Sequence, residues 1–103
     1  MVAEMYSSIS AYNGQALSRT SGRTYGYTIS SYTPSANETA EFKAYDGRSS
    51  NGWYWGDSNT SVSLTKGVEY SIVTSINIDN AVASNTKISV TATPKSYTIS
   101  YKD

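Results

Sequence analysis

Two tryptophans and a tyrosine lie side by side in one short stretch of the chain, and polar residues surround them. The segment from Tyr45 to Asp57 reads YDGRSSNGWYWGD and contains both tryptophans of the protein. A flat aromatic ring can stack on the apolar C–H face of a sugar ring, while carboxylate, amide and guanidinium groups bond the sugar hydroxyls. The candidate ligand-binding residues are therefore Tyr45, Asp46, Arg48, Asn51, Trp53, Tyr54, Trp55 and Asp57.

The two tryptophans have a second interpretation, as filling for a hydrophobic core. Trp53 and Trp55 alternate with Tyr54, so in a strand the tryptophans share one face and Tyr54 lies on the other. The chain of 103 residues has only sixteen Leu, Ile, Val and Phe residues but ten tyrosines. A core therefore needs large aromatic side chains, and both interpretations of the tryptophans stay open.

The composition excludes several kinds of chemistry. The chain has no His and no Cys, so it cannot build a Ser-His-Asp triad, a Cys nucleophile, a disulfide or the common zinc sites. Glu38, Glu41 and Glu69 fall on predicted solvent-facing strand positions and do not suggest the paired carboxylates of a glycoside hydrolase. Asp57-Ser58-Asn59 lacks the spacing of a calcium loop. We therefore expect no enzymatic activity, no cofactor and no metal.

The charge balance limits the partners and the location. Eight basic residues balance eight acidic ones, and no Lys/Arg cluster stands out, which argues against nucleic acid as a partner. No apolar run is long enough to span a membrane, and the first residues show no signal peptide. A Ser/Thr-rich chain with only 16% charged residues nevertheless favours a secreted or cell-surface protein.

Apolar and small polar residues alternate along several segments, and this period of two predicts strands with one buried face. The predicted inward positions are Tyr25, Tyr27 and Ile29; Ala40, Phe42 and Ala44; Val62 and Leu64; Val68, Tyr70, Ile72, Thr74, Ile76 and Ile78; Ile88, Val90 and Ala92; and Tyr97, Ile99 and Tyr101. Residues 2–12 and 53–55 are further strand candidates. The pairs Asn13-Gly14, Ser21-Gly22, Gly56-Asp57 and Lys66-Gly67 predict turns.

About seven or eight short strands separated by turns indicate an all-β fold. We predict a single antiparallel Greek-key β-sandwich that occupies residues 1–103 as one domain, with a jelly-roll-like sandwich as the alternative. No linker or change of composition divides the chain.

The segment from Leu64 to Tyr70, LTKGVEY, resembles the corner before the penultimate strands of fibronectin type III and related immunoglobulin-like domains. The resemblance covers residues 62–78, and Lys66 stands where those domains usually have Pro. It implies that Leu64 is a core residue and that the hydroxyl of Tyr70 bonds back to the corner backbone.

Three functions are compatible with these patterns. The first is a secreted, non-catalytic module that binds carbohydrate or another cell-surface component through the aromatic segment. The second is a self-associating structural or surface protein, because the uncharged segment 71–78 has high β-propensity, and a homo-oligomer fits this hypothesis. The third is a small inhibitor, immunity factor or toxin that binds another protein through loops at residues 13–23 and 46–51.

Overall fold

The computed structural model describes residues 3–46, 53–78 and 87–95, with the backbone alone for Asp46 and for residues 53–58. The elements in chain order are β1 (Ala3–Ser7), the 3-10 helix η1 (Ser10–Tyr12), β2 (Gln15–Ala16), β3 (Ser18–Ser21), β4 (Thr24–Tyr32), β5 (Glu38–Asp46), β6 (Trp53–Leu64), β7 (Tyr70–Asn77) and β8 (Ser89–Pro94). The predicted all-β class is confirmed.

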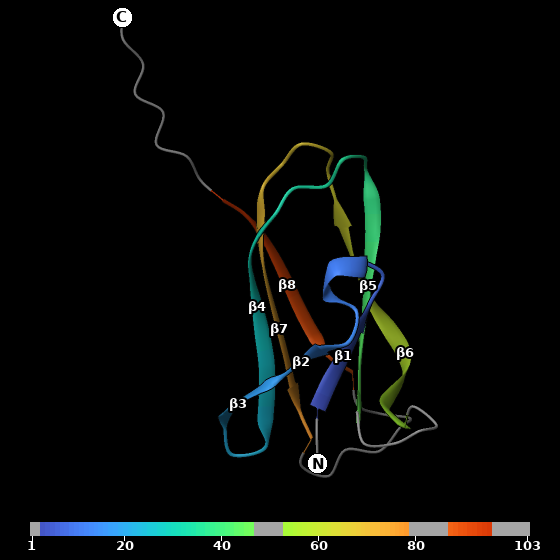
Figure 1. The fold of residues 1–103 in the computed structure, drawn as a ribbon, viewed down its shortest axis with the longest axis vertical. Helices are drawn as coiled ribbons and strands as arrows, with labels where there is room; N and C mark the ends of the chain where they lie inside the picture. The colour runs from blue at the N-terminus through green and yellow to red at the C-terminus, as the bar shows by residue number, and fades with distance from the viewer. Residues whose placement is uncertain (1–2, 47–52, 79–86, 96–103) are drawn as a thin grey trace, which may run out of the picture.

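Two antiparallel four-stranded sheets form the layers of a sandwich (Figure 1). Sheet A has the strand order β2-β1-β5-β6, and sheet B has the order β3-β4-β7-β8. Each neighbouring pair is antiparallel. The chain crosses from β2 to β3 through the single buried residue Leu17, so one short run of residues contributes an edge strand to each sheet. The Greek-key connectivity and the jelly-roll alternative stay predictions.

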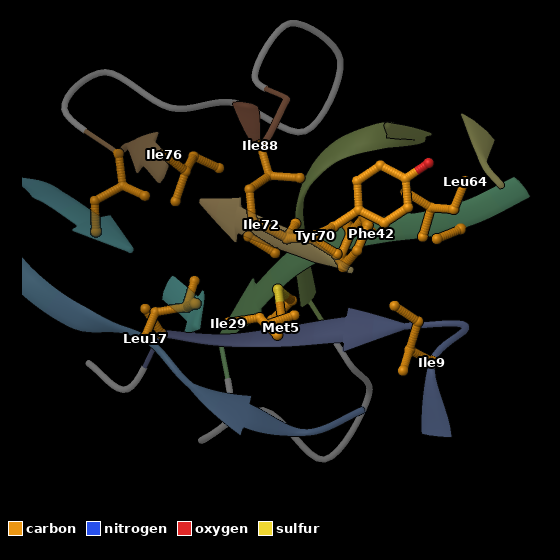
Figure 2. Packing of buried hydrophobic residues seen from close by; sticks show 14 residues of the cluster. Met5, Ile9, Leu17, Ile29, Phe42, Leu64, Tyr70, Ile72, Ile76 and Ile88 are labelled. Carbon is orange, nitrogen blue, oxygen red and sulfur yellow. The ribbon is translucent and has the colours of Figure 1, made fainter. Parts of the chain in front are cut away.

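The hydrophobic core lies between the two sheets, and the alternating positions supply it (Figure 2). Ala40, Phe42 and Ala44 of β5 are fully buried, as is Met5 of β1. They face Ile29 of β4 together with the inward residues of β7, from Tyr70 to Ile76. The predicted core faces of β4, β5 and β7 are confirmed, and Leu64 is buried as expected. Tyr25 and Tyr27 are half-buried and pack against the same core.

One threonine lies inside this core and forms hydrogen bonds with the backbone of β4. The Thr74 side chain is 2% exposed. Its hydroxyl donates to the Tyr27 carbonyl at 2.9 Å and accepts from the Tyr27 N–H at 3.1 Å. The two strands come so close here that a Cβ on Gly26 would lie 2.3 Å from the Thr74 carbonyl oxygen. Gly26 is therefore required by the approach of the neighbouring strand.

The corner between β6 and β7 contains the contact that the family resemblance implied. The hydroxyl of Tyr70 accepts a hydrogen bond from the Thr65 N–H at 2.8 Å. Gly67 has a φ of +80°, a conformation that favours glycine, and its N–H donates to the Pro34 carbonyl at 3.0 Å. Membership of that family stays a prediction, because one corner does not define a fold.

Several local predictions were wrong. Gly56-Asp57 does not form a turn, because β6 continues through it as a strand of 12 residues from Trp53 to Leu64. The candidate loop at residues 13–23 contains the edge strands β2 and β3. The candidate strand over residues 2–12 ends at Ser7 and is followed by η1. The predicted strand face of Tyr97, Ile99 and Tyr101 lies outside the described residues.

Replacing Gly26 by Ala is expected to destabilise the protein by about 1–3 kcal/mol, since the added methyl group must push the β7 backbone away. Urea unfolding followed by circular dichroism measures this change. Thr28→Ala, on the same outer face of β4 and exposed, is the matched control and should have little effect. Equal stability of the two variants would contradict the close approach at Gly26.

Candidate functional site

The predicted ligand-binding residues lie on the hairpin of β5 and β6 and on the connection between these strands. Asp46 pairs with Trp53, Tyr45 with Tyr54, and Ala44 with Trp55 in the strand register. Tyr45 is half-buried. The side chains of Asp46, Trp53, Tyr54, Trp55 and Asp57, and all of Arg48 and Asn51, lie outside the described residues.

Tyr45 belongs to a larger polar and aromatic surface on the outer face of sheet A. Glu4 lies directly opposite Tyr45 on β1, and Tyr6 lies opposite Lys43. The residues between them, Met5 and Ala44, are fully buried, so this set lies on the opposite, solvent-facing side of the sheet. We call Glu4, Tyr6, Glu41, Lys43, Tyr45 and Asn59 the tyrosine face; each is half-buried.

The Tyr45 side chain extends across the neighbouring strand. Its hydroxyl lies 3.9 Å from the position that a Cβ on Gly14 would occupy. Gly14 follows η1, and its N–H donates to the Met5 carbonyl at 2.7 Å on the far side of β1. The ring therefore reaches from β5 over β1, along the sheet surface. An aromatic ring in this position covers the backbone and can present a broad face to a ligand.

An irregularity in β6 brings an amide to the same surface. Phe42 pairs with Thr60, whereas Ala44 pairs with Trp55, so β6 has three more residues than β5 between these two pairs. Such a bulge redirects the strand locally. Asn59, within this bulge, donates from Nδ2 to the Glu41 carboxylate at 3.3 Å. The tyrosine face thus combines two phenol rings with a carboxylate, an amide-carboxylate pair and a lysine.

The outer face of sheet B has a different character. Its described positions on β7 and β8 are small and neutral, namely Ser71, Val73, Ser75, Ser89, Thr91 and Thr93. A shallow depression of about 310 Å³ lies over Gly26 and is lined by Thr20, Thr28, Val73 and Ser75 among others. The depression offers hydroxyls but neither a charged group nor an exposed aromatic ring, which makes it a weaker candidate for specific recognition.

A second depression, of about 390 Å³, lies where β5 and β6 meet the corner, and Glu38, Thr39 and Ser63 line it. The Tyr32 hydroxyl donates to the Glu38 carboxylate. This hydrogen bond, then burial and then the negative charge of Glu38 raise the pKa of Tyr32 from 10.0 to about 12. The carboxylate therefore already has a partner within the protein, and this contact ties β4 to the start of β5.

The sequence prediction found one member of the tyrosine face and missed its neighbours on β1. Glu41 was placed correctly on the solvent-facing side of a strand. Tyr6 and Glu4 were missed, although the alternation of Ala3, Met5 and Ser7 with Glu4 and Tyr6 was the available signal. The pairing of β1 with β5 joins residues about forty positions apart, and no local pattern reveals it.

The described residues contain no group of three or more Asp or Glu side chains placed to hold a metal ion. Within the same residues, no helix is both long and apolar enough to cross a membrane. Comparison with protein-family models, with curated proteins and with solved structures found no match to this chain.

The raised pKa of Tyr32 predicts a loss of stability at alkaline pH. The unfolded chain loses the Tyr32 proton near pH 10, but the folded protein holds it until about pH 12. The contribution of this hydrogen bond to the free energy of unfolding is therefore complete below pH 10 and is lost as the pH rises from 10 through 12. The difference in free energy of unfolding between the wild type and Tyr32→Phe should shrink over this range. A difference that stays constant from pH 9 to about pH 12 would contradict the contact.

Proposed function

We propose that the protein is a non-catalytic module that binds carbohydrate on the tyrosine face. The observation that carries the proposal is the position of Tyr6 and Tyr45 on one side of sheet A, beside Glu4 and Lys43. Aromatic rings give an apolar surface for the C–H face of a sugar, and the neighbouring carboxylate and ammonium groups can bond its hydroxyls.

The form of the face favours an extended glycan over a small free sugar. Tyr45 covers β1 as far as Gly14, and Tyr6 lies two residue pairs further along the same two strands, in the next pair on this face. Glu41 and Asn59 continue the surface onto β6. A ligand that spans these groups must cover three neighbouring strands, each separated by about 4.8 Å. Several linked sugar units fit that span better than one.

The proposal also includes the aromatic segment of the β5–β6 hairpin. Tyr54 pairs with Tyr45 in the strand register. Arg48 and Asn51 lie between these two residues in the sequence, and all three remain candidate ligand-binding residues in this proposal. The composition supports a secreted or cell-surface location, where polysaccharides are the abundant ligands, and the lack of His and Cys supports binding without catalysis.

Tyr6→Ala and Tyr45→Ala are each expected to weaken polysaccharide binding by at least about tenfold, since each removes a stacking surface worth about 1.4 kcal/mol. Affinity electrophoresis in gels that contain cell-wall, plant or animal polysaccharides identifies a ligand, and calorimetry measures the loss. Tyr45→Phe should retain most of the binding, because the ring remains.

Val73→Ala is the matched control, because Val73 is the exposed large apolar residue of the opposite sheet, at 46% exposure. This variant should bind like the wild type. If no polysaccharide retards the wild-type protein, or if Val73→Ala weakens binding as much as Tyr45→Ala does, the tyrosine face is not a carbohydrate site.

A further inference from the structure

Within the part of the chain that the structure describes, one side of strand β4 lacks a partner strand over half of its length. β3 pairs with β4 only from Thr24 to Gly26, and Figure 1 shows β3 beside one end of the longer strand. β7 covers the other side of β4 from Thr24 to Tyr32. Among the described residues, no strand lies beside Thr28 to Ser31 on the β3 side.

The backbone groups of this stretch point toward the open side. The N–H and carbonyl of Tyr27 both bond the Thr74 hydroxyl of β7, so they point toward β7. Because successive residues of a strand direct these groups to opposite neighbours, Thr28 and Ser30 present theirs away from β7. The register against β7 shifts between Ile29 and Tyr32, so the regular part of the open edge ends near Ser30.

The open stretch also lacks the features that keep sheet edges from pairing. Natural edge strands carry Lys, Pro or other charged residues that block a further strand. Pro94, which has no N–H, ends β8 at the other edge of sheet B, and Lys95 follows it. Arg19 lies in β3. From Thr28 to Ser31 the residues are Thr, Ile, Ser and Ser, without a charge or a proline.

We infer that this edge pairs with the same edge of a second copy of the chain. An antiparallel pairing about a two-fold axis at Ile29 places Thr28 of each copy opposite Ser30 of the other. Each of these two pairs can exchange two backbone hydrogen bonds. The opposed side chains are small, neutral and exposed, and the formal net charge of zero removes long-range repulsion between copies.

A second copy fits this edge better than an unrelated strand, because the edge is complementary to itself. Thr28 and Ser30 have equal spacing on either side of Ile29. A two-fold rotation about Ile29 therefore lets the backbone N–H and carbonyl groups of both residues form hydrogen bonds in both copies at once. The pairing uses an edge of sheet B and leaves the outer face of sheet A uncovered. The dimer would therefore present two tyrosine faces, but the inference does not depend on what that face binds.

The segment that the sequence marked as prone to pairing is not the one exposed. Residues 71–78 were the candidate for self-association, but β7 lies between β4 and β8 and has partners on both sides. The location of the contact thus differs from the sequence-based expectation.

Sedimentation velocity of the full chain from micromolar to millimolar concentration tests the inference. The wild type should dimerise reversibly. Ser30→Pro removes the N–H that the partner needs, and Ser30→Lys places like charges across the two-fold axis, so each variant should weaken dimerisation by at least about tenfold. Circular dichroism of both variants checks that they fold. If Ser30→Pro does not fold, Ser30→Lys alone tests the inference.

Thr91→Lys is the matched control, because Thr91 is an exposed threonine on the outer face of β8. It adds the same charge to the same sheet away from the β4 edge and should dimerise like the wild type. In the wild type, amide exchange at Thr28 and Ser30 should slow as the concentration rises. A wild-type monomer at millimolar concentration, a dimer that folded Ser30→Lys leaves intact, or a dimer that Thr91→Lys disrupts equally would overturn the inference.

Discussion

The packing of two sheets around a core with few large aliphatic residues is the constraint on which this protein depends. Sheet A contributes mainly small side chains, such as Ala40 and Ala44, around the larger Met5 and Phe42. Sheet B contributes Ile29, Ile72 and Ile76 to the same buried cluster (Figure 2). Dense packing of this cluster requires alternate residues of the core strands to point into the interior.

The same packing explains why a hydroxyl can lie within the core. Thr74 occupies an inward position of β7, but its hydroxyl donates one hydrogen bond to the Tyr27 carbonyl and accepts one from the Tyr27 N–H. No described buried side-chain nitrogen or oxygen lacks a partner, so the polar group costs little. The bond to Tyr27 also orients the backbone of β4, with the result that Thr28 and Ser30 present their backbone groups at the open edge.

With alternate positions committed to the core, the remaining positions give the two sheets different outer surfaces. Sheet A presents Tyr6, Tyr45 and their charged neighbours, which suit recognition of a polar ligand with apolar faces. Sheet B presents small neutral side chains and, among the described residues, the unpaired stretch of the β4 edge, which suit contact between backbones. The proposed ligand site and the inferred dimer contact therefore lie on different sheets, and neither needs the surface that the other uses.

The sequence by itself determined the all-β class and the inward faces of β5 and β7, because these follow from a period of two. The corner contact of Tyr70 was implied only by the resemblance to fibronectin type III and immunoglobulin-like domains. Only the tertiary structure decided that β6 continues through Gly56, that β1 lies beside β5 and that Tyr6 thereby joins Tyr45. Pairing between distant strands depends on how whole sheets bury their apolar faces, and no short segment encodes that choice.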